Sequence, residues 1–470
     1  MEMRKVSSIK KNFIYNVLYQ ILIILIPIIT VPYVSRILGA DQIGIYSYTY
    51  SIVYYFMLIS LLGINNYGNR TIAKSRDNKH ELSKSFFSIY IIQIIMSILM
   101  LILYLLYVLL FENSYKHIAL IQSIYIFSCI FDINWLFFGL EKFKITVTRS
   151  SLLKIISLIL IFIFVKNSND LSKYTLILAI STLLSQLLLL PFLKKEVNYT
   201  KISFNDIKQH IKPCLKLFIP VIAVSIYKIM DKIMLGVMCD ISEVGYYEQA
   251  EKIISIPIGL ITALGTVMLP RISNLIAKKD DIKVKEYINK SISFMMFLAF
   301  PIFFGLVGVS EDFIPIFLGS GFIKSSILIY YLASTVLFIS FANIIRTEYL
   351  IPKEKDNIYI ISVILGAIIN LIINYLLIPK YQSIGACIGT IFAEFSVMFY
   401  QLISIRKELP IINYIKNIIP YFLKALFMFI LIYLIKYINI LPIYRVILQV
   451  IIGIIIYGLL NIKYIKSFIK

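Results

Sequence analysis

Charged residues are scarce in this sequence. Lys, Arg, Asp and Glu make up 15% of its 470 residues, whereas about a quarter is usual for a domain that folds in water. Apolar residues make up 60% of the chain, and the mean hydropathy is +0.87. Apolar stretches of about 18 residues or more recur along it, which is the length that crosses a hydrocarbon layer of about 30 Å. We therefore expect the lipid bilayer to be the main solvent of this protein.

Residue types that commonly bind metals or catalyse reactions are few and scattered. The four cysteines, Cys129, Cys214, Cys239 and Cys387, lack the paired spacing of a metal site or a disulfide framework. The three histidines lie in predicted loops, where such a residue is usually a solvated surface group. No G-x-x-x-x-G-K-[ST] phosphate loop is present. We expect no metal, no cofactor and no enzymatic activity.

Acidic residues are fewer than basic ones, and the net charge is +21. Most Lys and Arg fall in alternate loops between the apolar runs, which is the signal that orients membrane proteins. No basic stripe interleaved with aromatic residues appears on a polar domain, so we expect no nucleic-acid partner. The basic loops would face the cytoplasm, which places both termini there and the protein in the inner (cytoplasmic) membrane of a bacterium. The alternate loops are short, so we expect no extracellular catalytic domain.

Apolar runs separated by polar breaks predict about fourteen transmembrane helices and an all-α integral membrane fold. The first run is too long for a signal peptide and lacks a small-residue cleavage site, so we interpret it as a span. The predicted spans cover residues 13–34, 43–64, 86–110, 118–139, 151–165, 174–193, 215–237, 253–269, 292–309, 326–345, 358–378, 384–403, 418–435 and 443–460.

Two similar segments of the sequence predict two lobes. The segment LGADQIGIY follows the first span at residues 38–46, and the seventh span is followed by LG at 235–236 and VGYY at 244–247. Six intervening spans are an even number, so the two copies point the same way through the membrane and form parallel repeats. We expect lobes of six helices at residues 1–195 and 196–405, followed by two C-terminal helices at 406–470.

Charged side chains at membrane depth are costly, which makes them candidates for function. The seventh span carries Lys228, Asp231 and Lys232 on one helical face. The fourth span carries Asp132, and the twelfth carries Glu394. A local pair of Lys and Asp leaves one extra cation, so a bound anion or a partner such as Glu394 or Asp132 is expected. Four further basic residues are expected to reach the membrane interfaces with their long side chains: Lys154, Lys252, Lys424 and Arg445.

Amides and phenols also recur at helical spacing inside the predicted spans. Such groups suit sugar hydroxyls, which lose their water partners in a membrane cleft. Hydrogen bonds between helices are the alternative interpretation. The candidates are Asn16 and Gln20 in the first span, Tyr46 and Tyr50 in the second, and Asn370 and Asn374 in the eleventh.

The ordered motifs of the chain resemble bacterial oligosaccharide flippases of the Wzx type, in the polysaccharide transporter family of the multidrug/oligosaccharidyl-lipid/polysaccharide exporter superfamily. The resemblance covers nearly the whole chain. In the first half it lies in PYVSRILG at residues 32–39, YGNRTIA at 67–73 and WLFFGLEKF at 135–143. In the second half it lies in DKIMLG at 231–236, LPR at 269–271, YLIP at 349–352, the segment 370–379 and GA at 385–386.

This resemblance implies a MATE-like fold, in which two six-helix lobes face a cleft and two helices follow. It implies alternating access for an oligosaccharide linked to undecaprenyl diphosphate, destined for capsule, O-antigen or a related surface polymer. Membrane lipid and polysaccharide assembly proteins would be its partners. On that reading the diphosphate candidates are Arg36, Arg70, Lys228 and Lys232, because cations in a dry cleft hold phosphate strongly. The acids expected to couple transport to protons or sodium are Asp132, Asp231 and Glu394.

Three alternatives remain open from the sequence. A multidrug extruder of the same fold would prefer cationic substrates and an acidic cleft, which the lysines at membrane depth disfavour. A lipid II flippase differs from the favoured reading in its cargo. A membrane polymerase or acyltransferase would need a catalytic base near the membrane or a large external loop.

Overall fold

The computed structural model describes the backbone of residues 9–469 and the side chains of residues 22, 25–262, 268–269 and 271–466. Over this range every regular element is a helix and no strand is present. The helices form two compact units, Met1–Ile222 and Ala223–Lys470. The all-α prediction is confirmed.

The first unit contains α1 to α8 and the first half of α9. The bounds are α1 Ile9–Leu61, α2 Ile64–Ser75, α3 Lys79–Leu110, α4 Lys116–Cys129, α5 Asn134–Gly139, α6 Phe143–Phe164, the 3-10 helix η1 Ser168–Asp170, α7 Leu171–Leu187, α8 Leu190–Glu196 and α9 Phe204–Met238. Within the unit, α1 packs against α3, α4 and α6, and α4 packs against α7.

Helix α1 is two helices joined across a kink at Gly39. This residue has φ 76° and ψ 175°, a conformation that a residue with a side chain rarely adopts. The kink lies between the first two predicted spans, at 13–34 and 43–64, so α1 supplies both of them.

A break also divides the fourth predicted span, where α4 ends at Cys129 and α5 begins at Asn134. Gln93 of α3 holds this break, since its Nε2 donates to the carbonyls of Cys129 and Asp132 at 2.6 and 2.8 Å. The Gln93 Oε1 in turn accepts a hydrogen bond of 2.9 Å from Trp135 Nε1. Trp135 is fully buried, so the break is part of the rigid core of the unit.

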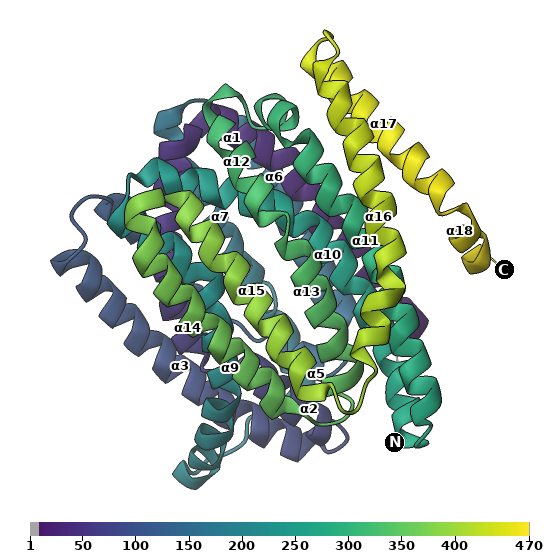
Figure 1. Cartoon of the computed structure of the whole chain (residues 1–470). Helices are drawn as coiled ribbons and strands as arrows, with labels where there is room; N and C mark the ends of the chain where they lie inside the picture. The colour runs from purple at the N-terminus through teal and green to yellow at the C-terminus, as the bar shows by residue number, and fades with distance from the viewer. Residues whose placement is uncertain (1–8, 470) are drawn as a thin grey trace. The chain divides into compact units, whose positions relative to one another are not determined.

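The second unit contains the rest of α9 and all later helices. The bounds are α10 Ile241–Ala277, α11 Asp281–Phe317, the 3-10 helix η2 Ser320–Phe322, α12 Ile323–Leu332, α13 Thr335–Ile344, the π-helix η3 Ile345–Leu350, α14 Asp356–Tyr381, α15 Ser383–Ile405, α16 Ile411–Leu434, the 3-10 helix η4 Ile435–Tyr437, α17 Pro442–Leu460 and α18 Ile462–Ile469. Figure 1 shows α14 and α15 lying side by side, and α16 and α17 both pack on α11.

The described helices cover the positions of the predicted membrane spans. In the described part of the chain, eleven helical segments are long and apolar enough to cross a membrane, and a bent pair, Ser320–Leu332 with Thr335–Leu350, makes a twelfth. The first of these segments, Leu25–Ser75, includes residues on both sides of the kink in α1. Helix α10, with 37 residues, lies where the eighth span is predicted. Counting α10 and each half of α1 gives the fourteen positions expected.

Candidate functional site

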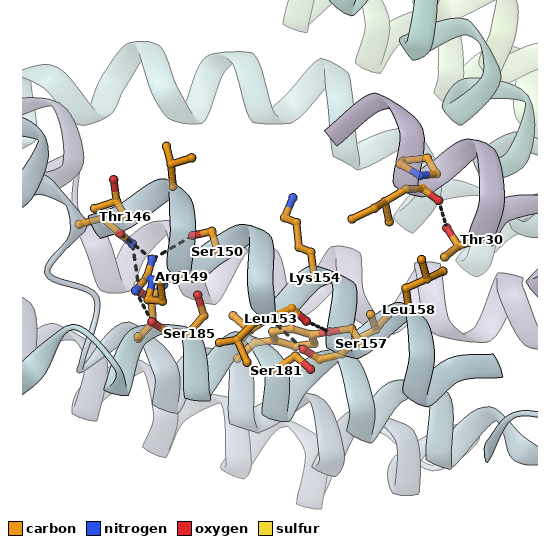
Figure 2. A pocket seen from close by; sticks show the side chains of 18 of the residues that line it. Thr30, Thr146, Arg149, Ser150, Leu153, Lys154, Ser157, Leu158, Ser181 and Ser185 are labelled. Atoms are coloured by element: carbon orange, nitrogen blue, oxygen red, sulfur yellow. Dashed lines mark hydrogen bonds between the residues drawn. The ribbon is translucent and has the colours of Figure 1, made fainter. Parts of the chain in front are cut away.

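The first unit contains an open cavity of about 910 Å³. This volume lies toward the upper end of the roughly 300 to 1,000 Å³ usual for sites that bind small molecules. Its walls come from α1, α2, α4, α5, α6 and α7. Figure 2 shows part of the lining, with polar side chains from α6 and α7 on the cavity wall.

Helix α6 contributes a polar stripe to the cavity. Thr146, Ser150, Lys154 and Ser157 recur every three or four residues, so they lie on one face of the helix. Other side chains of α6, such as Leu152, Ile159 and Ile163, are exposed, as expected for a surface that meets lipid. Figure 2 shows Lys154 extending from α6 into the cavity.

Aromatic rings line another part of the cavity. The rings of Tyr46 and Tyr50 stack with centroids 5.7 Å apart, and Tyr174 packs edge-on against Tyr46 at 5.2 Å. Tyr125 of α4 packs edge-on against Tyr50 at 5.1 Å, and its hydroxyl lies 3.1 Å from that of Tyr46. Four phenols therefore offer both flat apolar faces and hydroxyl groups to a ligand.

Arg149 is held in place at the same cavity. Its guanidinium donates to the carbonyl of Ser185, to Asn134 Oδ1 at 2.9 Å and to Ser150 Oγ at 3.1 Å. A longer contact of 3.4 Å reaches Gln186 Oε1. These four acceptors are neutral groups that fix the position of the guanidinium.

The lining of the cavity carries positive charge. Arg149 and Lys154 belong to it, and among the described residues no Asp or Glu does. A cation at membrane depth is costly unless an anion or a set of dipoles compensates it. A ligand that carries a negative charge together with hydroxyl groups matches this lining.

The second unit contains a buried polar cluster around Asp231, which is 1% exposed. The Asp231 Oδ2 accepts hydrogen bonds of 2.7 Å from both Tyr247 Oη and Thr390 Oγ1. The Asp231 Oδ1 accepts one of 2.6 Å from Asn374 Nδ2, which also contacts Asn370 Oδ1 at 3.2 Å. The cluster joins α9, α10, α14 and α15. Asp231 accepts from three donors, which fits an ionised carboxylate.

An ion cluster lies next to Asp231 in the chain. Lys232 Nζ is 2.6 Å from Glu248 and 2.7 Å from Glu251, and Lys252 is 2.9 Å from Glu248. Two lysines and two glutamates therefore balance one another. The partners of Lys232 come from the first turns of α10, whereas Glu394 interacts electrostatically with Lys228, the other lysine of this face.

Comparison with known proteins places this chain in a family. The family described as polysaccharide biosynthesis protein matches residues 9–276, more than half of the chain. The chain belongs to this family. A protein of Escherichia coli strain K12 that is named for O-antigen transport is 25% identical over 407 residues, which cover 85% of this chain and 97% of the relative. A Haloferax volcanii protein named as a flippase of low-salt glycan biosynthesis is 27% identical over 164 residues, 35% of this chain and 34% of the relative.

Solved structures share the fold of this polysaccharide biosynthesis protein. The lipid II flippase MurJ in an inward closed conformation matches 98% of this chain and 99% of its own, with a TM-score of 0.81 and 19% identity. A multidrug transporter of the MATE family in an inward-facing conformation matches 82% of this chain and 98% of its own, with a TM-score of 0.61 and 14% identity. The MATE-like fold predicted from the sequence is confirmed, and this family member is a multi-pass membrane protein.

The predicted sugar-binding residues fall in different places of this polysaccharide biosynthesis protein. Tyr46 and Tyr50 line the cavity of the first unit. Asn370 and Asn374 are fully buried in the Asp231 cluster of the second unit. The side chains of Asn16 and Gln20 lie outside the described residues. The assignment of all six to sugar binding stays a prediction.

The predicted diphosphate residues are not gathered at one point in either unit. Arg36 and Arg70 are exposed and are not part of the cavity lining described above. In the second unit Lys228 is exposed, whereas Lys232 is buried in the ion cluster. Their contact with a diphosphate stays a prediction.

The three acids predicted to couple ions are at least partly buried. Asp231 is the centre of its cluster, and Asp132 lies in the break between α4 and α5. Glu394 of α15 is 7% exposed and interacts electrostatically with Lys228. Their role in ion coupling stays a prediction.

Several cavity residues were missed from the sequence. Arg149 was placed in a loop, and Lys154 was expected to reach the membrane interface, yet both line the cavity. The signal that would have found them is the spacing of polar residues on α6 described above, continued by Tyr174, Ser181 and Ser185 on α7. One of the three histidines also differs from expectation, since His210 is buried on α9 and its Nδ1 lies 2.7 Å from Tyr67 Oη.

Gly389 of α15 gives a test of the Asp231 cluster. A Cβ added there would lie 2.0 Å from Asn374 Oδ1. Gly389→Ala is therefore expected to push Asn374 away from Asp231 and to destabilise the protein by about 1 to 3 kcal/mol, the usual cost of overpacking. Thermal unfolding in detergent measures the effect, with Gly259→Ala as control because nothing lies within 4 Å of its added Cβ. Equal unfolding temperatures for the two variants would contradict the packing argument.

Proposed function

We propose that this protein moves an oligosaccharide linked to undecaprenyl diphosphate across the cytoplasmic membrane of a bacterium by alternating access. The observation that carries the proposal is the cavity of the first unit, which combines two cations, four phenols and several hydroxyls and amides inside a bundle of membrane helices. Sugar hydroxyls need hydrogen-bond partners when they leave water, and a diphosphate needs cations. The cavity supplies both kinds of group.

The names of the relatives support a lipid-linked sugar as cargo. Proteins of Escherichia coli and Shigella dysenteriae named for O-antigen transport match 85% and 84% of the chain, and the Haloferax relative is named for a glycan flippase. We assign the cargo to the synthesis of capsule, O-antigen or a related surface polysaccharide. Proteins that assemble such polymers are the expected partners, together with membrane lipid.

The chemistry of the first unit gives each group a task. Lys154 and Arg149 meet the negative charge of the cargo, because charge-assisted hydrogen bonds are about twice as strong as neutral ones. The tyrosine faces stack on sugar rings, and the serine and threonine hydroxyls of α6 and α7 replace water around the sugar. Arg36, Arg70, Lys228 and Lys232 provide further diphosphate contacts while the lobes at 1–195 and 196–405 alternate.

Ion coupling is assigned to the buried acids, with Asp231 as the first choice and Asp132 and Glu394 as the others. Asp231 is held by three donors, and the neighbouring Asn374 Oδ1 is a buried acceptor with no hydrogen-bond partner among the described residues. The carboxylate of Asp231 and the amide oxygen of Asn374 together suit a proton or a sodium ion. The orientation proposed from the loop charges has both termini in the cytoplasm.

Reconstitution tests the function directly. Proteoliposomes that contain the full chain and a fluorescent oligosaccharide on polyprenyl diphosphate are expected to expose the sugar on the opposite leaflet faster than protein-free vesicles. A membrane-impermeant quencher or a lectin added outside measures the exposure. No acceleration over protein-free vesicles would refute the proposed function.

The same experiment tests two alternative cargoes and one alternative activity. Lipid II is a rival because the fold matches MurJ, and a cationic drug is a rival because it also matches a MATE transporter. We expect faster transport of the lipid-linked oligosaccharide than of either. Chromatography of the recovered lipid should show an unchanged sugar chain, and extension or acylation of that chain would instead indicate an enzyme.

A further inference from the structure

We infer that Asn134 links the charge of Asp132 to that of Arg149, so that the cavity of the first unit binds an anionic group more tightly when Asp132 is protonated. The inference rests on the proposed function, because it takes this cavity as the site that receives the anionic part of the cargo. It adds to that function a dependence of anion binding on protonation of Asp132, and it assigns Asn134 as a positioning residue.

The position of Asp132 makes such a role possible. It lies where a membrane span is interrupted, between the end of α4 and the start of α5. Interrupted spans free backbone and side-chain polar groups at membrane depth, and transporters use such places to bind ions. The carbonyls freed here are satisfied by Gln93, so the break keeps its shape while the charge of Asp132 changes.

Hydrogen bonds connect Asp132 to the cavity in two steps. Asn134 donates twice to Asp132 Oδ1, from its backbone N at 3.1 Å and from Nδ2 at 2.7 Å. The Oδ1 of the same Asn134 side chain accepts the 2.9 Å hydrogen bond from Arg149. Gln186 of α7 supports this link, because its Oε1 accepts from Asn134 Nδ2 at 3.0 Å and from Arg149 at 3.4 Å. Both contacts from Asn134 to Asp132 are donated by Asn134, as expected when Asp132 is ionised and can only accept.

Protonation of Asp132 would change this arrangement. A protonated carboxyl carries an O–H donor, and the side-chain oxygen of the same Asn134 amide is an acceptor within this network. If the amide turns to accept this proton, its NH₂ group faces Arg149, whose guanidinium can only donate. Arg149 then loses an acceptor, and the negative charge that compensates it through Asn134 disappears. The cavity becomes more positive, and an anionic group of a ligand takes the place of the lost acceptor.

Among the groups around Asp132, Arg149 is its main electrostatic partner. Arg149 of α6 is the charged group that acts on Asp132, and the titratable group beside it is the thiol of Cys129 on α4. The side chains that α3 and α7 bring to the network, Gln93 and Gln186, are neutral. Binding linkage is reciprocal, so an anion in the cavity also favours uptake of a proton by Asp132.

The chain offers its own reporter for a test. Trp135 is the single tryptophan of the sequence and follows Asn134 directly. The probe is a monosaccharide sulfate ester, because its charge stays constant from about pH 5 to pH 8, the range in which proteins are usually most stable. Titrating the full chain in nanodiscs with this ester at each pH gives a dissociation constant from Trp135 fluorescence. We expect binding to be about tenfold tighter at the low end of the range, within the 5- to 150-fold typical of coupled sites.

Two variants separate the link from a general effect of pH. Asp132→Asn has a neutral side chain with a donor and an acceptor, like the protonated acid, so we expect tight binding that no longer depends on pH. Asn134→Leu removes the amide that joins the two charges, so we expect a ratio of affinities across the pH range less than half that of the wild type. Asp41→Asn, which removes an exposed carboxylate elsewhere in the first unit, is the control and should keep the wild-type ratio.

Each remaining outcome would decide against the inference. Equal affinity at every pH in the wild type, absence of binding at any pH, or an unchanged ratio in Asn134→Leu would overturn it. The flipping assay is read separately. A wild type that flips the lipid-linked oligosaccharide but binds the ester without pH dependence refutes this inference alone, whereas a wild type that does not flip it refutes the proposed function.

Discussion

Lys154→Gln is expected to weaken the interaction with a lipid-linked oligosaccharide by about tenfold or more. A hydrogen bond to a charged group contributes about 1.5 to 3 kcal/mol, and 1.4 kcal/mol corresponds to a factor of ten. Glutamine keeps most of the length of the side chain and its ability to donate, but it removes the charge that the cavity lining presents. The dependence of the flipping rate on the concentration of the fluorescent lipid measures the change.

The control for this prediction is Lys173→Gln in the same unit. Lys173 is paired with Asp170, its side chain is 59% exposed, and it does not line the cavity. We expect it to flip at the wild-type rate. If Lys154→Gln also matches the wild type at every lipid concentration, the cavity of the first unit is not where the anionic part of the cargo binds.

Arg149 and Lys154 should respond differently to conservative exchange. Lys154→Arg keeps a mobile cation at the cavity and is expected to retain much of the activity. Arg149→Lys loses the planar fork that reaches Asn134, Ser150 and Ser185 at once, so we expect a larger loss. Equal effects of the two exchanges would contradict the assignment of separate roles.

The membrane fold could be predicted from two patterns in the sequence. Apolar length and the alternation of positive loops predicted fourteen spans, and the structure has a helix at each position. The helix of the fifth span, in contrast, begins at Phe143 rather than near 151. The basic residues Lys142, Lys144 and Arg149 predict a loop before residue 151. The structure continues the helix through Arg149, because its guanidinium finds acceptors on α5, α6 and α7 and need not reach water.

The site was predicted in part because the direction of a side chain is a tertiary property. Lys154 was expected at the interface since a long cationic side chain in a span usually reaches water, and only the position of α6 beside α7 shows that its face lines a cavity. The sequence suggests Asp231 for ion coupling and Asn374 for sugar binding, although the structure joins them by a hydrogen bond. Pairing between helices distant in the sequence decides such cases, and spacing along one helix does not reveal it.

Asp231→Asn is expected to abolish the response of transport to an imposed ion gradient, with at least a tenfold fall in the gradient-driven rate. The carboxamide keeps the size of the acid, so Tyr247, Thr390 and Asn374 remain packed around it, but no exchangeable charge is left. One unit charge removed from a buried cluster changes an ion's affinity by several kcal/mol at the low effective dielectric of such a site. Passive equilibration of the fluorescent lipid without a gradient should continue, because the cavity of the first unit is untouched.

Proteoliposomes with either a pH difference or a sodium difference identify the ion, since only one of the two should accelerate the wild type. Asp240→Asn is the matched control in the second unit, because Asp240 is exposed at the start of α10 and makes no side-chain capping bond. Glu394→Gln, measured in parallel, tests the other buried acid of that unit. If Asp231→Asn still responds to the gradient while Glu394→Gln does not, the coupling ion binds on α15 near Lys228, and the Asp231 cluster serves to hold α9, α10, α14 and α15 together.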